Sequence, residues 1–181
     1  MKSKVSYKEV LPLPIVGEFN NFKLFNKFSD FISYLINDYN ADDYILGRGT
    51  NTLPIKREIK RKVIKVKEEI IKIKGDELFV SGNTLISKIH NKIKGLKAGN
   101  FIGVNTIPGS IGAAIRGNAT YKNYDAYKGL ERIIVFDQGK FSKIDTKNIK
   151  RSYRSTNIKG IVIFAIYKLV YNYDERLEKD L

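Results

Sequence analysis

The stretch NTIPGSIGAAIRGNAT, residues 105–120, is a run of small residues without lysine in a chain that is otherwise rich in lysine. It holds three glycines and one proline. Gly109 and Gly112 leave room for a ligand to approach the backbone or for a positive φ, and Pro108 fixes the entry to the segment. Ser110 adds a hydroxyl group beside main-chain amides, which bind anions in such loops. The segment therefore predicts a phosphate-binding loop.

A second bare turn, residues 47–51 (Gly-Arg-Gly-Thr-Asn), follows the short apolar run 43–46, which is typical of a strand. Exposed N–H groups at the end of a strand can hold another anion or a pyrophosphate. Two such loops in one chain suggest a dinucleotide ligand. The turn lacks the third glycine of GxGxxG and the chain has no GxxxxGKS/T, so neither a Rossmann nor a Walker site is indicated. Taken alone, each loop could also be an ordinary tight turn.

The composition narrows the kinds of chemistry that the chain can carry. Its 181 residues are 43% hydrophobic, which suffices for one domain or two small ones. Cysteine is absent and His90 is the single histidine, so we expect no disulfide, no thiolate nucleophile and no metal site. His90 lies within a helical pattern and is expected to be an ordinary core or surface residue. Pro12 and Pro14 interrupt the N-terminal apolar patch, so we expect a cytoplasmic protein without a membrane partner.

The net charge of +14 raises the possibility of nucleic-acid binding. The basic residues are mostly lysines and are scattered from Lys2 to Lys179. The densest cluster, residues 56–62, is expected to be the solvated face of a loop. Nucleic acid is therefore the less favoured partner.

The hydrophobic pattern predicts an α+β domain built as two unequal lobes. Helices are expected at 22–39, from apolar residues spaced by three and four, and after Thr84 as N-cap, ending at Gly95. Strands are expected at 43–46; at 63–66, 69–73 and 77–82, as a meander or hairpin set; and at 130–136 and 160–171.

Four segments resemble the UDP-N-acetylenolpyruvoylglucosamine reductase family in their order and intervals. They are LGRGTNTL (46–53), NFIGVNTIPGSIGAAIRGNATY (100–121), SYRST (152–156) and IVIFAIYKL (161–169). The family typically shows LGGGSN, then GIPGTVGGA with NAGAYG, and then a GYR motif. The resemblance implies a two-lobed FAD-binding domain of the vanillyl-alcohol oxidase type, with residues 1–75 as the smaller lobe, 76–175 as the larger lobe and 176–181 as a tail.

The resemblance also implies roles for individual residues. Tyr153 and Arg154 match the Tyr-Arg pair that faces the substrate, where the arginine stabilises the enolate formed after hydride transfer. A surface cation in a polar loop is the alternative for Arg154, and burial would favour function because a buried arginine needs an anion. NADPH is the implied electron donor and a nucleotide sugar the implied substrate. The implied cofactor-binding residues are Gly47, Arg48, Gly49, Thr50, Asn51, Gly82, Ile107, Pro108, Gly109, Ser110, Gly112, Asn118 and Ala119.

The chain departs from the family pattern in three places. Residues 13–17 retain only Gly17 of an N-terminal arginine and paired glycines, and residues 118–123 keep Asn-Ala of NAGAYG but lose its glycines. The sequence ends at Leu181, where the family continues into a substrate domain that carries a catalytic serine and a glutamate. We therefore expect a shortened FAD oxidoreductase domain, impaired alone or completed by a second polypeptide. The alternative is a catalytically silent flavin- or partner-binding module.

Overall fold

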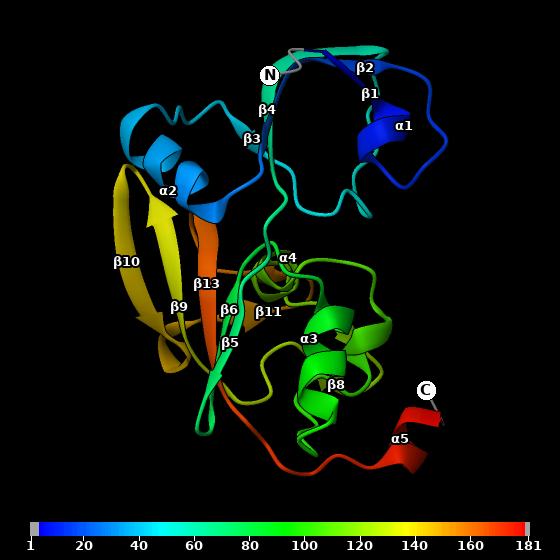
Figure 1. Cartoon of the computed structure of the whole chain (residues 1–181), viewed down its shortest axis with the longest axis vertical. Coiled ribbons are helices and arrows are strands. Elements are labelled where there is room, and N and C mark those ends of the chain that lie inside the picture. Colours follow the sequence, from blue (N-terminus) through cyan, green and yellow to red (C-terminus); the bar gives the residue numbers. More distant parts are fainter. Residues whose placement is uncertain (1–3, 180–181) are drawn as a thin grey trace. The chain divides into compact units, whose positions relative to one another are not determined.

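The computed structural model describes residues 4–179, which divide into two compact units (Figure 1). The N-terminal unit ends at Glu68 and the C-terminal unit begins at Glu69. The expected boundary at residue 75 falls after β5 (Ile71–Lys74), but β5 pairs with β6 (Glu77–Ser81) in the sheet of the C-terminal unit. The expected tail overlaps α5 (Glu175–Lys179), and residues 1–3, 180 and 181 lie outside the described residues.

A four-stranded sheet forms the centre of the N-terminal unit. Its strand order is β1 (Val5–Ser6), β2 (Glu18–Phe25), β4 (Glu58–Val66) and β3 (Tyr44–Ile45). Strands β2 and β3 both run parallel to β4, whereas β1 is antiparallel to β2. The carboxyl ends of three strands therefore meet at one edge of the sheet. The unit also contains α1 (Tyr7–Val10) and α2 (Phe28–Asn37).

The expected helix 22–39 is wrong in its first part, because Phe22 and Phe25 lie in β2 and the helix begins at Phe28. Both rings are buried, but in different surroundings. Phe22 belongs to the cluster that includes α1, whereas the ring of Phe25 lies 5.2 Å from that of Tyr34 in α2. A strand that is covered on both faces has no period of two. The buried phenylalanines of β2 are three residues apart, so their pattern resembled a continuation of the helix.

The basic cluster at 56–62 was expected in a loop, but from Glu58 onward it belongs to β4. Strand β4 pairs with β2 and β3, so it does not form a meander with β5 and β6. The hairpin of β5 and β6 is confirmed. Alternation on β4 was hidden because Lys60, Arg61 and Lys62 follow one another where the register between β2 and β4 shifts.

A buried carboxylate joins α2, β3 and β4. Asp43 accepts hydrogen bonds from the Tyr34 hydroxyl and from the N–H of Asn40, and its Oδ1 lies 3.4 Å from the Lys62 Nζ. Lys62 also donates to the Tyr34 hydroxyl at 3.0 Å. Burial alone would raise the pKa of Asp43, but the hydrogen bonds from Tyr34 and Asn40 and the Lys62 charge outweigh burial and lower that pKa.

The C-terminal unit is built on a five-stranded antiparallel sheet. The order is β10 (Lys140–Asp145), β9 (Leu130–Asp137), β13 (Ile161–Lys168), β6 and β5. Helices α3 (Ile86–Lys94) and α4 (Ile111–Arg116) share one apolar core with the sheet (Figure 1). Short elements complete the unit: η1 (Val104–Thr106), β7 (Thr120–Tyr121), β8 (Tyr124–Asp125), η2 (Thr146–Asn148), β11 (Arg151–Ser152) and β12 (Ser155–Thr156).

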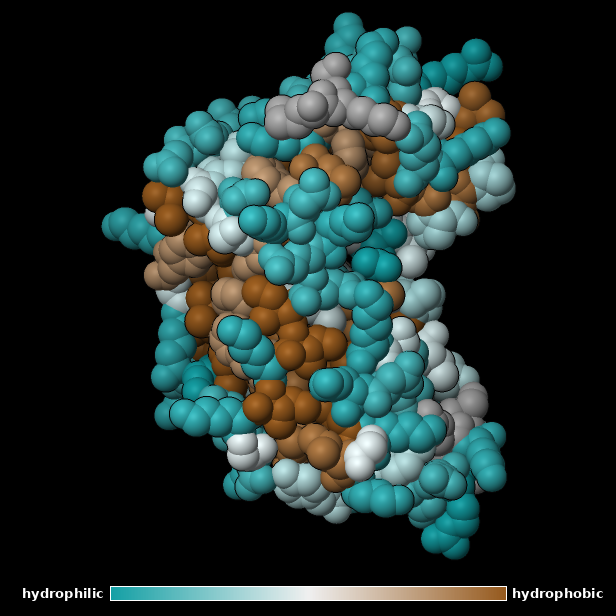
Figure 2. Space-filling model, in the orientation of Figure 1, coloured by the Kyte–Doolittle hydropathy of each residue, from teal (hydrophilic) through white to brown (hydrophobic). Residues whose placement is uncertain are grey.

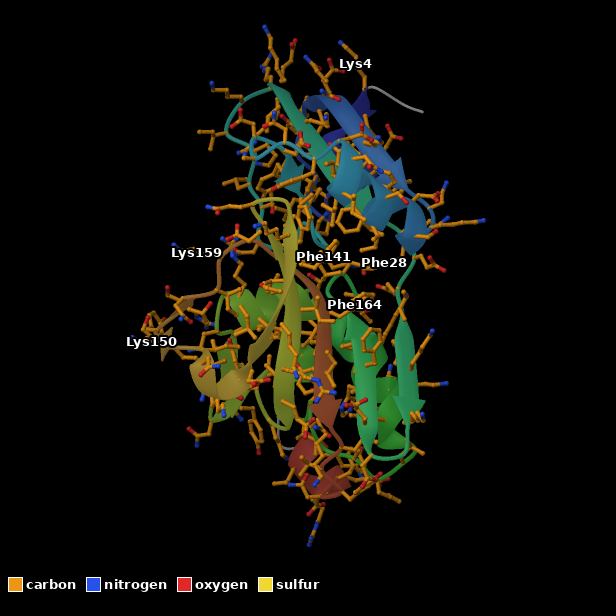
Figure 3. The ribbon with its side chains drawn as sticks, turned by 90° about the vertical axis from the view of Figure 1, so that its left-hand side faces the viewer. Lys4, Phe28, Phe141, Lys150, Lys159 and Phe164 are labelled. Atoms are coloured by element: carbon orange, nitrogen blue, oxygen red, sulfur yellow. The ribbon has the colours of Figure 1, made fainter. Side chains whose placement is uncertain are left out.

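The sheet of the C-terminal unit also carries phenylalanine rings that do not belong to the core shared with α3 and α4. Phe79 stacks on Phe164 with 4.4 Å between ring centroids, and Phe136 lies 4.9 Å from Phe141. Figure 3 shows Phe141 and Phe164 toward the same end of the sheet. Figure 2 shows apolar residues gathered over the sheet of the C-terminal unit.

The N-terminus of α3 is held by a residue distant in sequence. Thr84 was expected to cap this helix, but its Oγ1 lies 2.9 Å from the Ser81 Oγ and helps to close the turn after β6. Instead, the Glu69 carboxylate accepts the N–H of Leu85 at 3.2 Å and pairs with Lys88. The end of the helix at Gly95 is confirmed.

Two glycines allow α4 to approach the turn after β6. The N–H of Gly112 donates to the Gly82 carbonyl oxygen at 2.8 Å, and a Cβ on Gly112 would lie 2.8 Å from that oxygen. A Cβ on Gly82 would overlap the carbonyl oxygen of Val162 in β13. Side chains at these positions would therefore force main-chain atoms apart.

Charged residues are dispersed over the surface. Hydrophilic residues are spread over the face in Figure 2, and Lys150 and Lys159 project from the loops on either side of β11 and β12 (Figure 3). Between residues 4 and 179, no helix is both long enough and apolar enough to cross a membrane.

We expect Asp43→Asn to lower the free energy of unfolding at neutral pH by roughly 1–3 kcal/mol, because it removes the charge that Lys62 and Tyr34 stabilise. A carboxyl whose pKa is lowered by folding stabilises the protein above its unfolded pKa of about 3.9 and loses this effect as the pH falls through its folded pKa. The variant should therefore lose less stability in acid than the parent does. Urea unfolding at several pH values measures this, with the exposed Asp42→Asn as the matched control. If the free energy of unfolding fell equally for the parent and Asp43→Asn as the pH was lowered, this expectation would be wrong.

We expect Gly112→Ala to destabilise the protein by about 1–3 kcal/mol, because its Cβ meets backbone atoms of Gly82 that cannot turn away. The control is Gly95→Ala, since Gly95 has a helical φ of −60° and a methyl group added there would have no other atom within 4 Å. That change should be neutral or slightly stabilising. Thermal unfolding of both variants decides the matter, and equal melting temperatures would show that α4 does not depend on this close approach.

Candidate functional site

The glycine turn, residues 47–51, begins where β3 ends. Leu46 extends the pairing by donating its N–H to the Ile64 carbonyl oxygen, and the chain then leaves the sheet. Gly49 is buried with a φ of +76°, and a Cβ at this position would lie 2.6 Å from the Leu11 side chain. Glycine is therefore required here by conformation and by packing. The turn lies at the carboxyl edge of the parallel strands, where open α/β sheets bind their ligands.

The glycine-rich segment, residues 105–120, begins in η1, contains the whole of α4 and ends at the start of β7. Ser110 is buried and forms an isolated bridge with Leu85, in which Ile111 donates to the Thr84 carbonyl oxygen at 2.9 Å. The N–H of Gly112 is likewise bonded to Gly82. These two amides are already used within the protein. Any anion contact made by this segment must therefore come from its other groups.

Packing of the backbone thus explains why glycine occurs at positions 82 and 112. Both glycines allow backbone segments to meet, so their occurrence does not require a ligand. Their assignment to the cofactor site stays a prediction. Among the other expected residues, Pro108 is exposed, whereas Ile107 and Gly109 are half-buried.

The end of α4 meets the hairpin of β11 and β12. Asn118 has a φ of 44° and donates from its Nδ2 to the Ser152 carbonyl oxygen at 2.8 Å. Thr156 donates to the carbonyl oxygen of Arg116, also at 2.8 Å. The structure therefore brings together two motifs, Asn118-Ala119 and SYRST, that are separated in sequence. Within residues 4–179, the buried Oδ1 of Asn118 has no hydrogen-bond partner, which leaves an acceptor for a ligand.

Tyr153 and Arg154 form the tip of this hairpin. Tyr153 is 88% exposed, and the Arg154 guanidinium lies 5.7 Å from its ring centroid. Arg154 has a φ of 54° and is exposed. The argument from burial, which favoured a functional Arg154, therefore does not apply. The positive φ instead fits the tight two-residue turn.

Three residues that the sequence did not single out hold the base of the hairpin. Arg151 pairs with Asp125 at 2.8 Å, and its guanidinium lies 4.4 Å from the centroid of the Tyr127 ring. The Tyr127 hydroxyl donates to the Ile115 carbonyl oxygen in α4 at 2.7 Å, and burial raises the pKa of Tyr127 to about 12. Tyr127 therefore stays protonated at neutral pH. No spacing rule connects these positions, so the sequence carried no signal for them.

The expected site residues fall into two groups, one in each unit. The glycine turn belongs to the N-terminal unit, whereas residues 105–120, Gly82 and the hairpin belong to the C-terminal unit. Each group has its own chemistry: the N-terminal unit offers a glycine turn at a strand end, which suits an anion, and the C-terminal unit offers the Ser110 segment and the unpaired Oδ1 of Asn118. Across residues 4–179, no group of acidic or histidine side chains could hold a metal ion.

Comparison with known sequences gives one curated relative of interest. No family model matches the chain. UDP-N-acetylenolpyruvoylglucosamine reductase of Fervidobacterium nodosum is 25% identical over 145 residues, which cover 75% of this chain and 45% of that protein. The chain therefore spans less than half the length of this relative.

Solved structures show the same fold. The crystal structure of UDP-N-acetylenolpyruvylglucosamine reductase from Thermus caldophilus aligns with a TM-score of 0.80 and 21% identity, over 97% of this chain and 65% of that one. An alkyldihydroxyacetonephosphate synthase aligns with a TM-score of 0.60 and 10% identity, over 86% of this chain and 32% of its own. Phl p 4, a glucose dehydrogenase, aligns with a TM-score of 0.56 and 14% identity, over 87% of this chain and 36% of its own. The fold is that of FAD-binding domains of the vanillyl-alcohol oxidase type, and in sequence and fold the chain resembles the UDP-N-acetylenolpyruvoylglucosamine reductase family.

Proposed function

We propose that the chain binds FAD and serves as the flavin domain of an NADPH-dependent reductase acting on an enolpyruvyl nucleotide sugar. The observation that carries this proposal is the agreement between the 25% identical sequence relative and the fold match over 97% of the chain, both to the same kind of reductase. The motifs LGRGTN, IPGSIG and SYRST occur in the order of that family. FAD would supply the hydride-transfer chemistry, and the protein would supply binding and orientation.

The residues of the chain have distinct tasks in this proposal. Residues 47–51 hold a pyrophosphate through main-chain amides and the Thr50 hydroxyl, and the positive φ of Gly49 sets the shape of this turn. The Oδ1 of Asn118 accepts a hydrogen bond from the polar edge of the bound heterocycle. Arg154 offers its charge to the substrate, where it opposes the negative charge that develops during reduction.

A catalytically silent flavin-binding module is the second candidate. The exposure of Tyr153 and Arg154 at a hairpin tip favours it, because a group that stabilises a transition state is normally held in a preorganised site. In the first candidate, the substrate or a second polypeptide covers this hairpin and completes the site. The two candidates share FAD binding and differ in turnover.

We expect the purified protein to be yellow and to release FAD, not FMN, on denaturation. Thr50→Ala should weaken FAD binding by about tenfold, since a hydrogen bond to a charged group contributes roughly 1.5–3 kcal/mol. Thr52→Ala, which changes the same residue type just beyond the turn, is the control and should bind FAD like the parent. Flavin absorbance during titration of the apoprotein measures both affinities. A parent protein that takes up no FAD would overturn the proposed function.

We expect NADPH to bleach the flavin absorbance of the FAD-loaded protein in the absence of oxygen. If the domain is an active reductase, an enolpyruvyl nucleotide sugar should restore the colour, and Arg154→Gln should slow this second phase without changing FAD affinity. Stopped-flow absorbance separates the two phases. A protein that binds FAD but responds neither to NADPH nor to the substrate would establish the silent module instead.

A further inference from the structure

Arg151 joins two short hairpins of the C-terminal unit. It lies in β11, opposite Thr156 of β12, in the hairpin that ends in Tyr153 and Arg154. Its Nη1 lies 2.8 Å from the Oδ2 of Asp125, which belongs to β8 in the hairpin of β7 and β8. The ion pair therefore connects the hairpin that carries the Tyr-Arg motif to a second hairpin from another part of the sequence.

The ring of Tyr127 holds the Arg151 guanidinium from a second direction. The guanidinium lies 4.4 Å from the ring centroid, which is within the range of a cation–π interaction. Tyr127 is itself fixed, because its hydroxyl donates to the Ile115 carbonyl oxygen in α4 and its N–H donates to the Oδ1 of Asp125 at 2.9 Å. A planar guanidinium that is both paired and stacked has a defined orientation. Arg151 is thus held against ordered parts of the unit.

The tip of the hairpin depends on its base for its position. Tyr153 and Arg154 are exposed, so burial does not fix them. The side chains of Arg151 and Asp125 are 41% and 32% exposed, and ion pairs that are open to water contribute little to the free energy of unfolding. We therefore expect this ion pair to act locally, on the direction of β11, and to have little effect on the stability of the whole fold.

We propose that Arg151 is a positioning residue, which orients the hairpin so that Arg154 meets the substrate. The inference rests on the proposed reductase function, to which it adds the residue that places the substrate-facing cation. A charge that opposes the negative charge of a transition state is effective only where it is held in place beforehand. Loss of the Arg151 side chain should therefore act through Arg154, and FAD binding should not change.

Fluorescence anisotropy measures the order of the hairpin tip. The chain contains no tryptophan, so Tyr153→Trp provides a single reporter there. Arg151→Gln and Asp125→Asn should each lower the anisotropy of this reporter, because each change breaks the ion pair. Asp125→Asn keeps an oxygen for the N–H of Tyr127. The control is Lys150→Gln, which removes an exposed neighbouring charge and leaves the ion pair intact. Thermal unfolding checks that each variant is folded.

Reoxidation of the flavin shows whether Arg151 acts through Arg154. The full chain is loaded with FAD, reduced with NADPH and mixed with UDP-N-acetylenolpyruvoylglucosamine as the probe. Arg151→Gln should slow reoxidation by about tenfold, since misplacement of a catalytic group lowers the rate, and should leave FAD affinity unchanged. Added to Arg154→Gln, the same change should cause no further slowing, because two residues that act as a unit are not additive. Lys150→Gln should react like the parent.

Failure of the positioning role can be told apart from failure of the proposed function. The role would be overturned if Arg151→Gln left the anisotropy and the reoxidation rate unchanged. It would also be overturned if Arg151→Gln slowed reoxidation equally with and without the Arg154 side chain, since its effect would then not pass through Arg154. A parent protein that takes up no FAD, or that the probe does not reoxidise, would overturn the reductase function and the positioning role with it.

Discussion

The main-chain hydrogen bond from Gly112 to Gly82 is the constraint on which the candidate site of the C-terminal unit depends. It brings the first turn of α4 against the backbone that follows β6, at a distance that no side chain would permit. With the start of the helix fixed, Ile111 and Ile115 enter the core, and the carbonyl oxygen of Arg116 at the end of α4 accepts a hydrogen bond from Thr156 in the hairpin of β11 and β12. The IPGSIG motif therefore has a packing role in this structure, and its contact with a cofactor stays a prediction.

The sequence predicted those features that follow from local pattern. The α+β class, the hairpin of β5 and β6, the end of α3 at Gly95 and the strands β9 and β13 all agree with the structure. The errors arose where tertiary structure overrides pattern. The strand β2 is buried on both faces, so its hydrophobic pattern was mistaken for that of a helix. Glu69 caps α3 from a position outside the helix that no N-cap rule could identify. Sequence spacing likewise could not show that Asn118 meets Ser152.

The two units contribute different elements to one proposed function. In the N-terminal unit, parallel strands end at a common edge, and the glycine turn begins there. In the C-terminal unit, α4 links the glycine-rich segment to the hairpin that carries Tyr153 and Arg154. The net charge of +14 is spread over both units, and nucleic acid stays the less favoured partner in our prediction.

Hydrogen–deuterium exchange of the full chain with and without FAD tests the placement of the ligand most directly. The amides of Ile111 and Gly112 are already hydrogen-bonded within the protein, so their exchange should change little. We expect FAD to slow exchange in residues 47–51 and at Gly109 and Ser110, and to leave the outer strand β10 unchanged. Bound FAD that protects neither the glycine turn nor the start of the IPGSIG motif would contradict the placement of the cofactor on these two loops.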